Sequence, residues 1–189
     1  MSIDADAFRG ALAHVPMPVA VVTALDSGGE PHGMTIGSLC SLSVAPPLVL
    51  FCVDRGAAAH GVLCRAERYC LSVLGAGQEE VARRFAHRAP DRFAAQVVGL
   101  DGLPAIDGAL MWLSCDRHQV LDGGDHSIIV ARVDSVRVGP GRPLVYHDRG
   151  YGTIAARLAP AAAVDVPGPE SAPVSSARPG RPGSLAARR

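Results

Sequence analysis

Short β-rich runs recur along this sequence, and turn residues rather than helices separate most of them. The runs are PVAVVTAL (18–25), MTIGSLCSLS (34–43), PPLVLFCV (46–53), YCLSVL (69–74), ALMWLSC (109–115), HSIIVARVDSVRV (126–138) and PLVYH (143–147). Branched and aromatic residues, which favour strands, dominate these runs. No regular strand–helix–strand alternation connects them, so the sheet is expected to be chiefly antiparallel.

This pattern predicts six or seven strands and two or three helices in one mainly β domain. Closing an antiparallel sheet into a barrel removes its exposed edges, so we predict a Greek-key barrel with peripheral helices. The unbroken apolar run at 46–53 predicts a strand buried on both faces. Helices are expected over 4–14, with Ser2 or Asp4 as N-cap, over 57–67 and over 78–86.

The composition changes at residue 159. From there to residue 189, Pro, Ala, Ser, Gly and Arg dominate, and neither an aromatic residue nor Ile occurs. Such a segment buries too little apolar surface to offset the entropy of ordering it. We therefore predict one folded domain over 1–158 and a disordered tail over 159–189. A solvated tail is favoured over one whose arginines contact a partner or RNA.

Charge and cysteine content narrow the functional classes. The formal net charge is zero, which predicts no nucleic-acid partner. The apolar stretch 15–25 is interrupted by Pro16 and Pro18 and is shorter than the roughly 20 residues of a membrane span. The five cysteines show no CxxC spacing, which argues against zinc and a disulfide framework and favours a reducing cytoplasm. We predict no metal site and no membrane association.

Hydroxyl side chains alternate with apolar ones in PHGMTIGSLCSLSVAPPLVLFCVDR, residues 31–55. In an extended chain Thr35 and Ser41 point to the same side, and Ser38 to the other unless a bulge intervenes. Hydroxyls and backbone amides can bind a phosphate or a planar heterocycle, and Arg55 could add a charge-assisted bond to a phosphate. The alternative is a solvated strand face with an ordinary surface arginine.

A second polar segment precedes the longest apolar strand. LDGGDHSIIVARV, residues 121–133, places two glycines, Asp125 and His126 before that strand. Glycine lets the backbone approach a ligand closely, and an Asp–His pair can hold a polar ligand at the start of the strand. The alternative is a turn in which the aspartate only caps the histidine.

Four segments, taken in order, resemble the flavin reductase-like, FMN-binding split-barrel family. They are HGMTIGSLCSLSVAPPLVLFCV, ARRFA with the nearby DRF, GDHSIIVARV, and PLVYHDRGYG. The resemblance extends from about Phe8 to Ile154, and is strongest to the small reductase components of two-component flavin-dependent monooxygenases. It implies a mainly β fold with peripheral helices, an antiparallel Greek-key split barrel.

The resemblance also implies an activity, NAD(P)H-dependent flavin reduction by a cytoplasmic homodimer. Such an oxidoreductase passes a hydride from NADH or NADPH to FMN or FAD and supplies reduced flavin to a partner monooxygenase. The rings must be stacked in contact, but no acid–base side chain is required, and none is predicted.

The family motifs then imply the residues of the site. The residues expected at the flavin are Thr35, Ser38, Ser41, Cys52, Val53, Asp54 and Arg55, with Phe85 and Phe93 as pocket walls. For the two phenylalanines a place in the core is the alternative. The GDH motif, Gly124, Asp125 and His126, is expected to bind the nicotinamide nucleotide.

The sequence departs from the family in two places. After Arg55 it reads GAAA, where relatives often carry hydroxyl or amide side chains, and Gly37 stands where they often place Ser. Phosphate contacts would then come from backbone amides or from the start of the following helix. These departures leave the choice between FMN and FAD open.

Two other functions are compatible with the same barrel. One is a non-catalytic flavin-binding or storage protein, because a fold does not fix a function. The other is a split-barrel flavoenzyme such as a pyridoxamine-phosphate oxidase-like oxidase. The GDH motif favours the reductase over storage, and the sequence lacks the basic cluster expected for a phosphorylated substrate.

Overall fold

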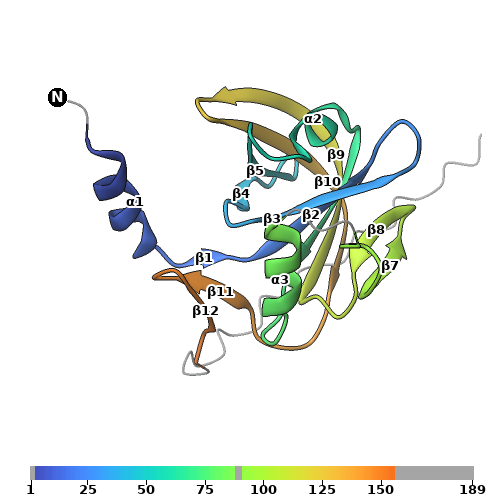
Figure 1. Cartoon of the computed structure of the whole chain (residues 1–189). Coiled ribbons are helices and arrows are strands. Elements are labelled where there is room, and N and C mark those ends of the chain that lie inside the picture. Colours follow the sequence, from blue (N-terminus) through green and yellow to red (C-terminus); the bar gives the residue numbers. More distant parts are fainter. Residues whose placement is uncertain (1–2, 88–90, 156–189) are drawn as a thin grey trace, which may run out of the picture. The chain divides into compact units, whose positions relative to one another are not determined.

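The structure is a computed structural model that describes residues 3–87 and 91–155 (Figure 1). The predicted tail at 159–189 lies outside the described residues. The helices are α1 (Ala5–Ala13), α2 (His60–Arg65) and α3 (Glu79–Ala86). The strands are β1 (Met17–Pro18), β2 (Ala20–Leu25), β3 (Pro31–Ile36), β4 (Cys40–Ser43), β5 (Leu48–Asp54), β6 (Arg68–Val73), β7 (Val97–Leu100), β8 (Leu103–Ile106), β9 (Met111–Gly123), β10 (His126–Val138), β11 (Leu144–His147) and β12 (Gly150–Thr153).

One antiparallel sheet of seven strands forms the barrel, in the order β3-β2-β6-β9-β10-β5-β4. Its edge strands β3 and β4 are consecutive in the chain, so the short link from Gly37 to Leu39 joins the two edges. A three-stranded sheet, β1-β11-β12, and the β7–β8 hairpin complete the β structure of the described residues. The predicted mainly β antiparallel barrel is confirmed.

The barrel interior is the main core. Alternate residues of β2 and β5, including Val22, Phe51 and Val53, point inward and are fully buried. A second cluster lies on the outside of β2, where Val21 packs against the buried face of α3. Burying β2 on both faces explains why its sequence is apolar at nearly every position.

Strand β5 differs from the prediction that it is buried on both faces. Val49, Phe51 and Val53 are buried, but Leu48, Leu50 and Cys52 between them are only half-buried. The outward side of β5 is therefore apolar in sequence without being covered by another part of the described chain.

The helices form where the sequence predicts them. The carboxylate of Asp4 caps α1 by accepting hydrogen bonds from the amides of Asp6 and Ala7, at 3.1 and 2.9 Å. The helix expected over 57–67 is shorter, His60–Arg65. In α3, Glu79 and Arg83 form an ion pair one turn apart, at 3.2 Å.

Candidate functional site

Ser38 lies in the link between the edge strands β3 and β4, and its side chain joins this link to Cys52 of β5. We call this junction, together with the β4–β5 pairing, the seam of the barrel. The Ser38 hydroxyl accepts a hydrogen bond from the Cys52 amide at 2.8 Å and lies 3.4 Å from the Cys52 carbonyl oxygen, to which it can donate. The backbone pairing of β4 with β5 ends at Cys40 and Leu50, so this side chain continues the ladder by one more step. The seam thus joins two segments of the predicted flavin motif, residues 35–41 and 52–55.

The other two predicted hydroxyls lie apart from the seam. Thr35 faces α3, and its hydroxyl donates to the Ala82 carbonyl at 2.7 Å. Its oxygen keeps lone pairs that can accept a hydrogen bond. Ser41 is exposed on the edge strand β4, opposite Val49. Thr35, Ser38 and Ser41 therefore do not form one row.

A tight turn follows β5. Cys52 is half-buried, Val53 is fully buried and Asp54 is exposed. The Asp54 carboxylate accepts a hydrogen bond from the Gly56 amide at 2.7 Å, which fixes the turn before α2. Because its side chain is buried, Val53 can offer only backbone groups to a ligand.

Arg55 is directed at the β9–β10 turn. Its Nε donates to the Gly124 carbonyl at 2.9 Å, and its guanidinium reaches the Asp122 carboxylate at 2.5 Å. Its backbone amide donates to the Asp125 carbonyl at 3.0 Å. The hydrogen bond from Arg55 is the main cause that lowers the pKa of Asp122. Arg55, the residue predicted to bind the flavin phosphate, is therefore in contact with the predicted nicotinamide motif.

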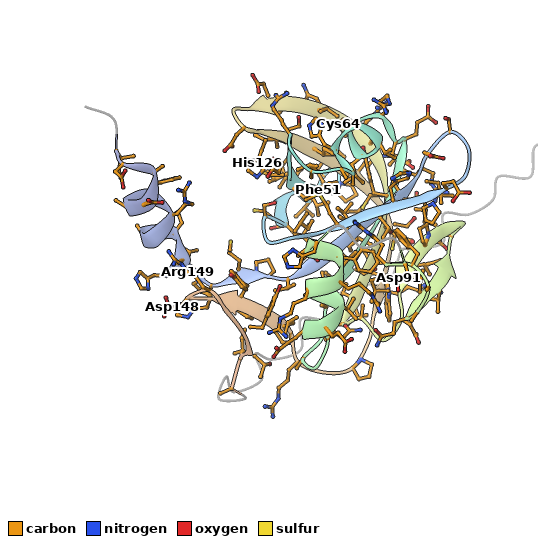
Figure 2. The ribbon with its side chains drawn as sticks, in the orientation of Figure 1. Phe51, Cys64, Asp91, His126, Asp148 and Arg149 are labelled. Atoms are coloured by element: carbon orange, nitrogen blue, oxygen red, sulfur yellow. The ribbon has the colours of Figure 1, made fainter. Side chains whose placement is uncertain are left out.

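The GDH motif forms the β9–β10 turn, Gly124 and Asp125, and the first residue of β10, His126. Gly124 has a φ of 77°, a left-handed conformation that glycine adopts without strain. Asp125 lies 2.7 Å from Nδ1 of His126, and this hydrogen bond is the main cause that lowers the pKa of Asp125. The contact leaves the His126 Nε2 atom free of Asp125, and the His126 side chain, labelled in Figure 2, is 42% exposed.

The two predicted phenylalanine walls pack against each other, Phe85 in the core and Phe93 half-buried at its edge. Phe85 is 1% exposed and packs in the cluster between α3 and the barrel. Phe93 meets it edge-to-face, with ring centroids 5.2 Å apart. Phe85 cannot line a pocket because its ring is covered on all sides, so the core alternative describes it correctly.

A cavity of about 510 Å³ opens beside Thr35, between β3, α3, β1 and the β11–β12 hairpin. Apolar and aromatic side chains form much of its lining, and Arg83 and Arg149 lie at its wall. Its size is that of a site for a ring-containing small molecule. The lining residues are Met17, Val19, Thr35, Ile36, Gly37, Arg83, Ala86, His87, Tyr146, Arg149, Gly150 and Tyr151.

Sequence reasoning missed the contribution of the β11–β12 hairpin to this cavity. Tyr146 and Tyr151 pack edge-to-face at 5.1 Å, and the Arg83 guanidinium lies 5.3 Å from the centre of the Tyr151 ring. Partial burial raises the pKa of the Tyr151 hydroxyl. The signal was present, because Tyr151 belongs to the PLVYHDRGYG segment that resembles the family.

A two-residue turn connects strands β11 and β12 of this hairpin. Asp148 and Arg149 have φ values of 48° and 62°, and both residues are labelled in Figure 2. Left-handed backbone at both central residues is the geometry of a type I′ hairpin turn.

Within the described ranges, no group of three or more His, Cys, Asp or Glu could hold a metal ion. Residues 3–87 and 91–155 also contain no helix long and apolar enough to cross a membrane.

Comparisons with known proteins define the class. Residues 12–155 match the family model described as "Flavin reductase like domain". The chain therefore belongs to the flavin reductase-like family, which confirms the resemblance seen in the sequence.

Individual relatives agree with this assignment. The chain is 38% identical to a flavin reductase of Pseudomonas putida over 158 residues, 82% of this chain and 93% of the relative. It is 34% identical to the reductase subunit HsaB of a flavin-dependent monooxygenase of Rhodococcus jostii over 157 residues, 79% and 78% of the two chains. The structure of an NADH:FAD oxidoreductase of Streptomyces globisporus, solved with NAD and FAD fragments, superposes with a TM-score of 0.76. That pair is 35% identical, and the match covers 83% of this chain and 98% of the other.

Proposed function

We propose that the protein is an NAD(P)H:flavin oxidoreductase that transfers a hydride from a nicotinamide nucleotide to FMN or FAD. The observation that carries this proposal is the direct contact between the β5 end of the flavin motif and the GDH turn, made by Arg55. An enzyme that transfers a hydride between two ring systems must hold its two binding segments side by side. The names of the relatives, which include a flavin reductase, an NADH:riboflavin 5'-phosphate oxidoreductase and an NADH-dependent FAD reductase, support the same activity.

The residues of the chain bind and orient, and the bound flavin and nicotinamide supply the redox chemistry. We assign the flavin to Thr35, Ser38 and Ser41, to the backbone of residues 52–54 and to Arg55. Thr35 and Ser38 each retain a hydroxyl lone pair beyond the hydrogen bonds that the protein makes. The cavity at Thr35 provides apolar walls for a planar ring.

Gly124, Asp125 and His126 are assigned to the nicotinamide nucleotide. Asp125 contacts Nδ1 of His126 and leaves Nε2 for a ligand. Gly124 carries no side chain, and nothing lies within 4 Å of where its Cβ would be, so a ligand can approach the backbone of the turn closely.

The test is anaerobic mixing of the purified protein with NADH and FMN or FAD, followed through the flavin absorbance. Bleaching of the visible band at catalytic protein concentration is expected, and a His126→Ala variant should need a higher NADH concentration for the same rate. A flavin that binds tightly but is never bleached would identify a storage protein instead. Binding of pyridoxamine phosphate with oxidation in air would identify the oxidase alternative.

We also propose that a separate monooxygenase receives the reduced flavin. The support comes from relatives that are named as reductase components or subunits of such systems. All five cysteines are free thiols, which fits work in the reducing cytoplasm.

A homodimer is proposed from two uncovered apolar surfaces. No residue of α1 is buried, and Phe8, Leu12 and Val15 are each about half exposed. The outward side of β5, β10 and the end of β9 carries a second surface, formed by Leu50, Cys52, Leu121 and Ile128. A second copy that covered them would remove this apolar area from water. Light scattering should therefore give twice the chain mass, and Phe8→Glu should lower it.

A further inference from the structure

We infer that His60 is a positioning residue for His126, acting through the buried hydroxyl of Ser127. The inference rests on the proposed nicotinamide role of the GDH motif. His60 begins α2, and its Nε2 lies 3.0 Å from the Ser127 hydroxyl oxygen. Ser127 follows His126 directly in β10, so the contact connects α2 with the backbone that carries the proposed ligand-binding histidine.

Ser127 is a polar residue in an apolar place. It is 5% exposed and pairs with Val53 on the inward side of the barrel, in line with Ile129 and Ala131. A buried hydroxyl is costly unless it has a hydrogen-bond partner. Among the described residues, His60 provides that partner, and it does so from an element outside the sheet.

His126 needs such support because its own side-chain contact is weak. Its ring is held by Asp125, whose side chain is 93% exposed, and exposed ion pairs contribute little. The direction of the ring is therefore set mainly by the backbone at the start of β10. That backbone is fixed from outside by the bond from the Arg55 amide to the Asp125 carbonyl, and from inside by His60 and Ser127.

The same helix offers a matched control. Cys64 lies one turn after His60, and its Sγ is 3.4 Å from the same Nε2 atom. It forms no hydrogen bond with Ser127 and has no place in the proposed flavin or nicotinamide sites. Cys64→Ala thus changes the surroundings of His60 while leaving the bond to β10 intact.

The experiment measures NADH kinetics at saturating FMN, and FMN affinity, for the full chain and its variants. His60→Ala is expected to raise the KM for NADH about 3- to 10-fold, the range of one neutral hydrogen bond. The kcat and the FMN affinity should change less than about 2-fold. His60→Gln, whose amide can reach the position of Nε2, should restore most of the KM, and Cys64→Ala should match the wild type.

A double-mutant cycle separates positioning from general stability. If His60 acts through His126, then His60→Ala should add no further increase in KM when His126 is already alanine. Independent, multiplying effects on KM, or an equal loss of FMN affinity, would overturn the inference. So would an unchanged KM in His60→Ala alongside a raised KM in His126→Ala. If His126→Ala itself leaves KM unchanged, the nicotinamide assignment fails and this inference fails with it.

Discussion

At the scale of single residues, the Asp122 carboxylate and a flavin phosphate would compete for Arg55. In the structure its guanidinium binds Asp122 and the Gly124 carbonyl, and the side chains of Arg55 and Asp122 are 46% and 81% exposed. An ion pair this exposed is worth little, so a phosphate could replace Asp122 at small cost.

We expect Arg55→Ala to weaken FMN binding about 10- to 100-fold and riboflavin binding much less, because only FMN carries a phosphate. Asp122→Asn, which removes the competing carboxylate, should leave FMN affinity at or above that of the wild type. Fluorescence titration with both flavins measures the difference. Equal losses for the two flavins in Arg55→Ala would show that Arg55 serves only the β9–β10 turn.

Cysteine chemistry also differs from residue to residue. Burial raises the pKa of Cys70 from 9.0 to about 11 and that of Cys115 to about 12, whereas Cys40 is exposed. At pH 8 iodoacetamide should therefore label Cys40 in the native protein and should reach Cys70 and Cys115 only after unfolding. Mass spectrometry of the digested protein locates the label. Native labelling of Cys115 would contradict the buried environment described here.

The same shifts fix the sign of an alkaline effect on stability. The folded state favours the protonated thiols, because their folded pKa values lie above the unfolded value of 9.0. This contribution is complete below pH 9 and is lost as the pH rises through about 11 to 12. The urea midpoint is therefore expected to fall progressively above pH 9.

At the scale of elements, the β9–β10 turn depends on one backbone conformation. Gly124→Ala would place a side chain at a φ of 77°, which costs about 1 kcal/mol and tilts the proposed nicotinamide site. Gly10→Ala is the matched control, since it also has open space around its Cβ but lies inside α1. That change should stabilise by about 0.5–1 kcal/mol. Urea unfolding of both variants should show the opposite signs.

The apolar pattern predicted the long strands of the barrel, but it missed the exposed end of β9 and the β7–β8 hairpin, although the hairpin buries Leu103, Ala105 and Ile106. Residues 126–138 were predicted as one strand, and β10 spans His126–Val138. Strand β9 was expected to end at Cys115, but it continues to Gly123, and its exposed end from Gln119 onward pairs only with β10. The β7–β8 hairpin was not among the predicted strands, because its strands are short and Pro104 lies within β8.

The residues of the candidate site also differ in how far the sequence predicted them. Local motifs indicated the turn at Asp125 and the seam residues Ser38 and Cys52. The pairing of Arg55 with Asp122 was not predictable, because the register that aligns β5 with β10 joins residues about seventy positions apart. Phe85 was assigned to the pocket by motif, although the spacing of Val81, Ala82 and Phe85 on α3 is that of a buried helix face.

At the scale of the whole molecule, the tail provides a test of the domain boundary. Residues 159–189 are proposed to contribute neither to the core nor to the site, since they lack core-forming side chains. Deleting the chain from Pro160 onward should therefore leave the rate of flavin reduction and the melting temperature nearly unchanged. A drop of many degrees would place the true boundary further along the chain.

The hydrogen bond of Ser38 affects how easily the β4 edge of the barrel opens locally. Because a single hydroxyl extends the seam beyond the four-residue strand β4, this edge can open without disturbing β2, β6 or β9. In deuterated buffer the amides of β4 should exchange long before those of Phe51 and Ile129 in the barrel wall. Ser38→Ala should speed the exchange of the Cys52 amide most. A ligand that bridges the seam would slow the same amides, which makes deuterium uptake at β4 a label-free report of flavin occupancy.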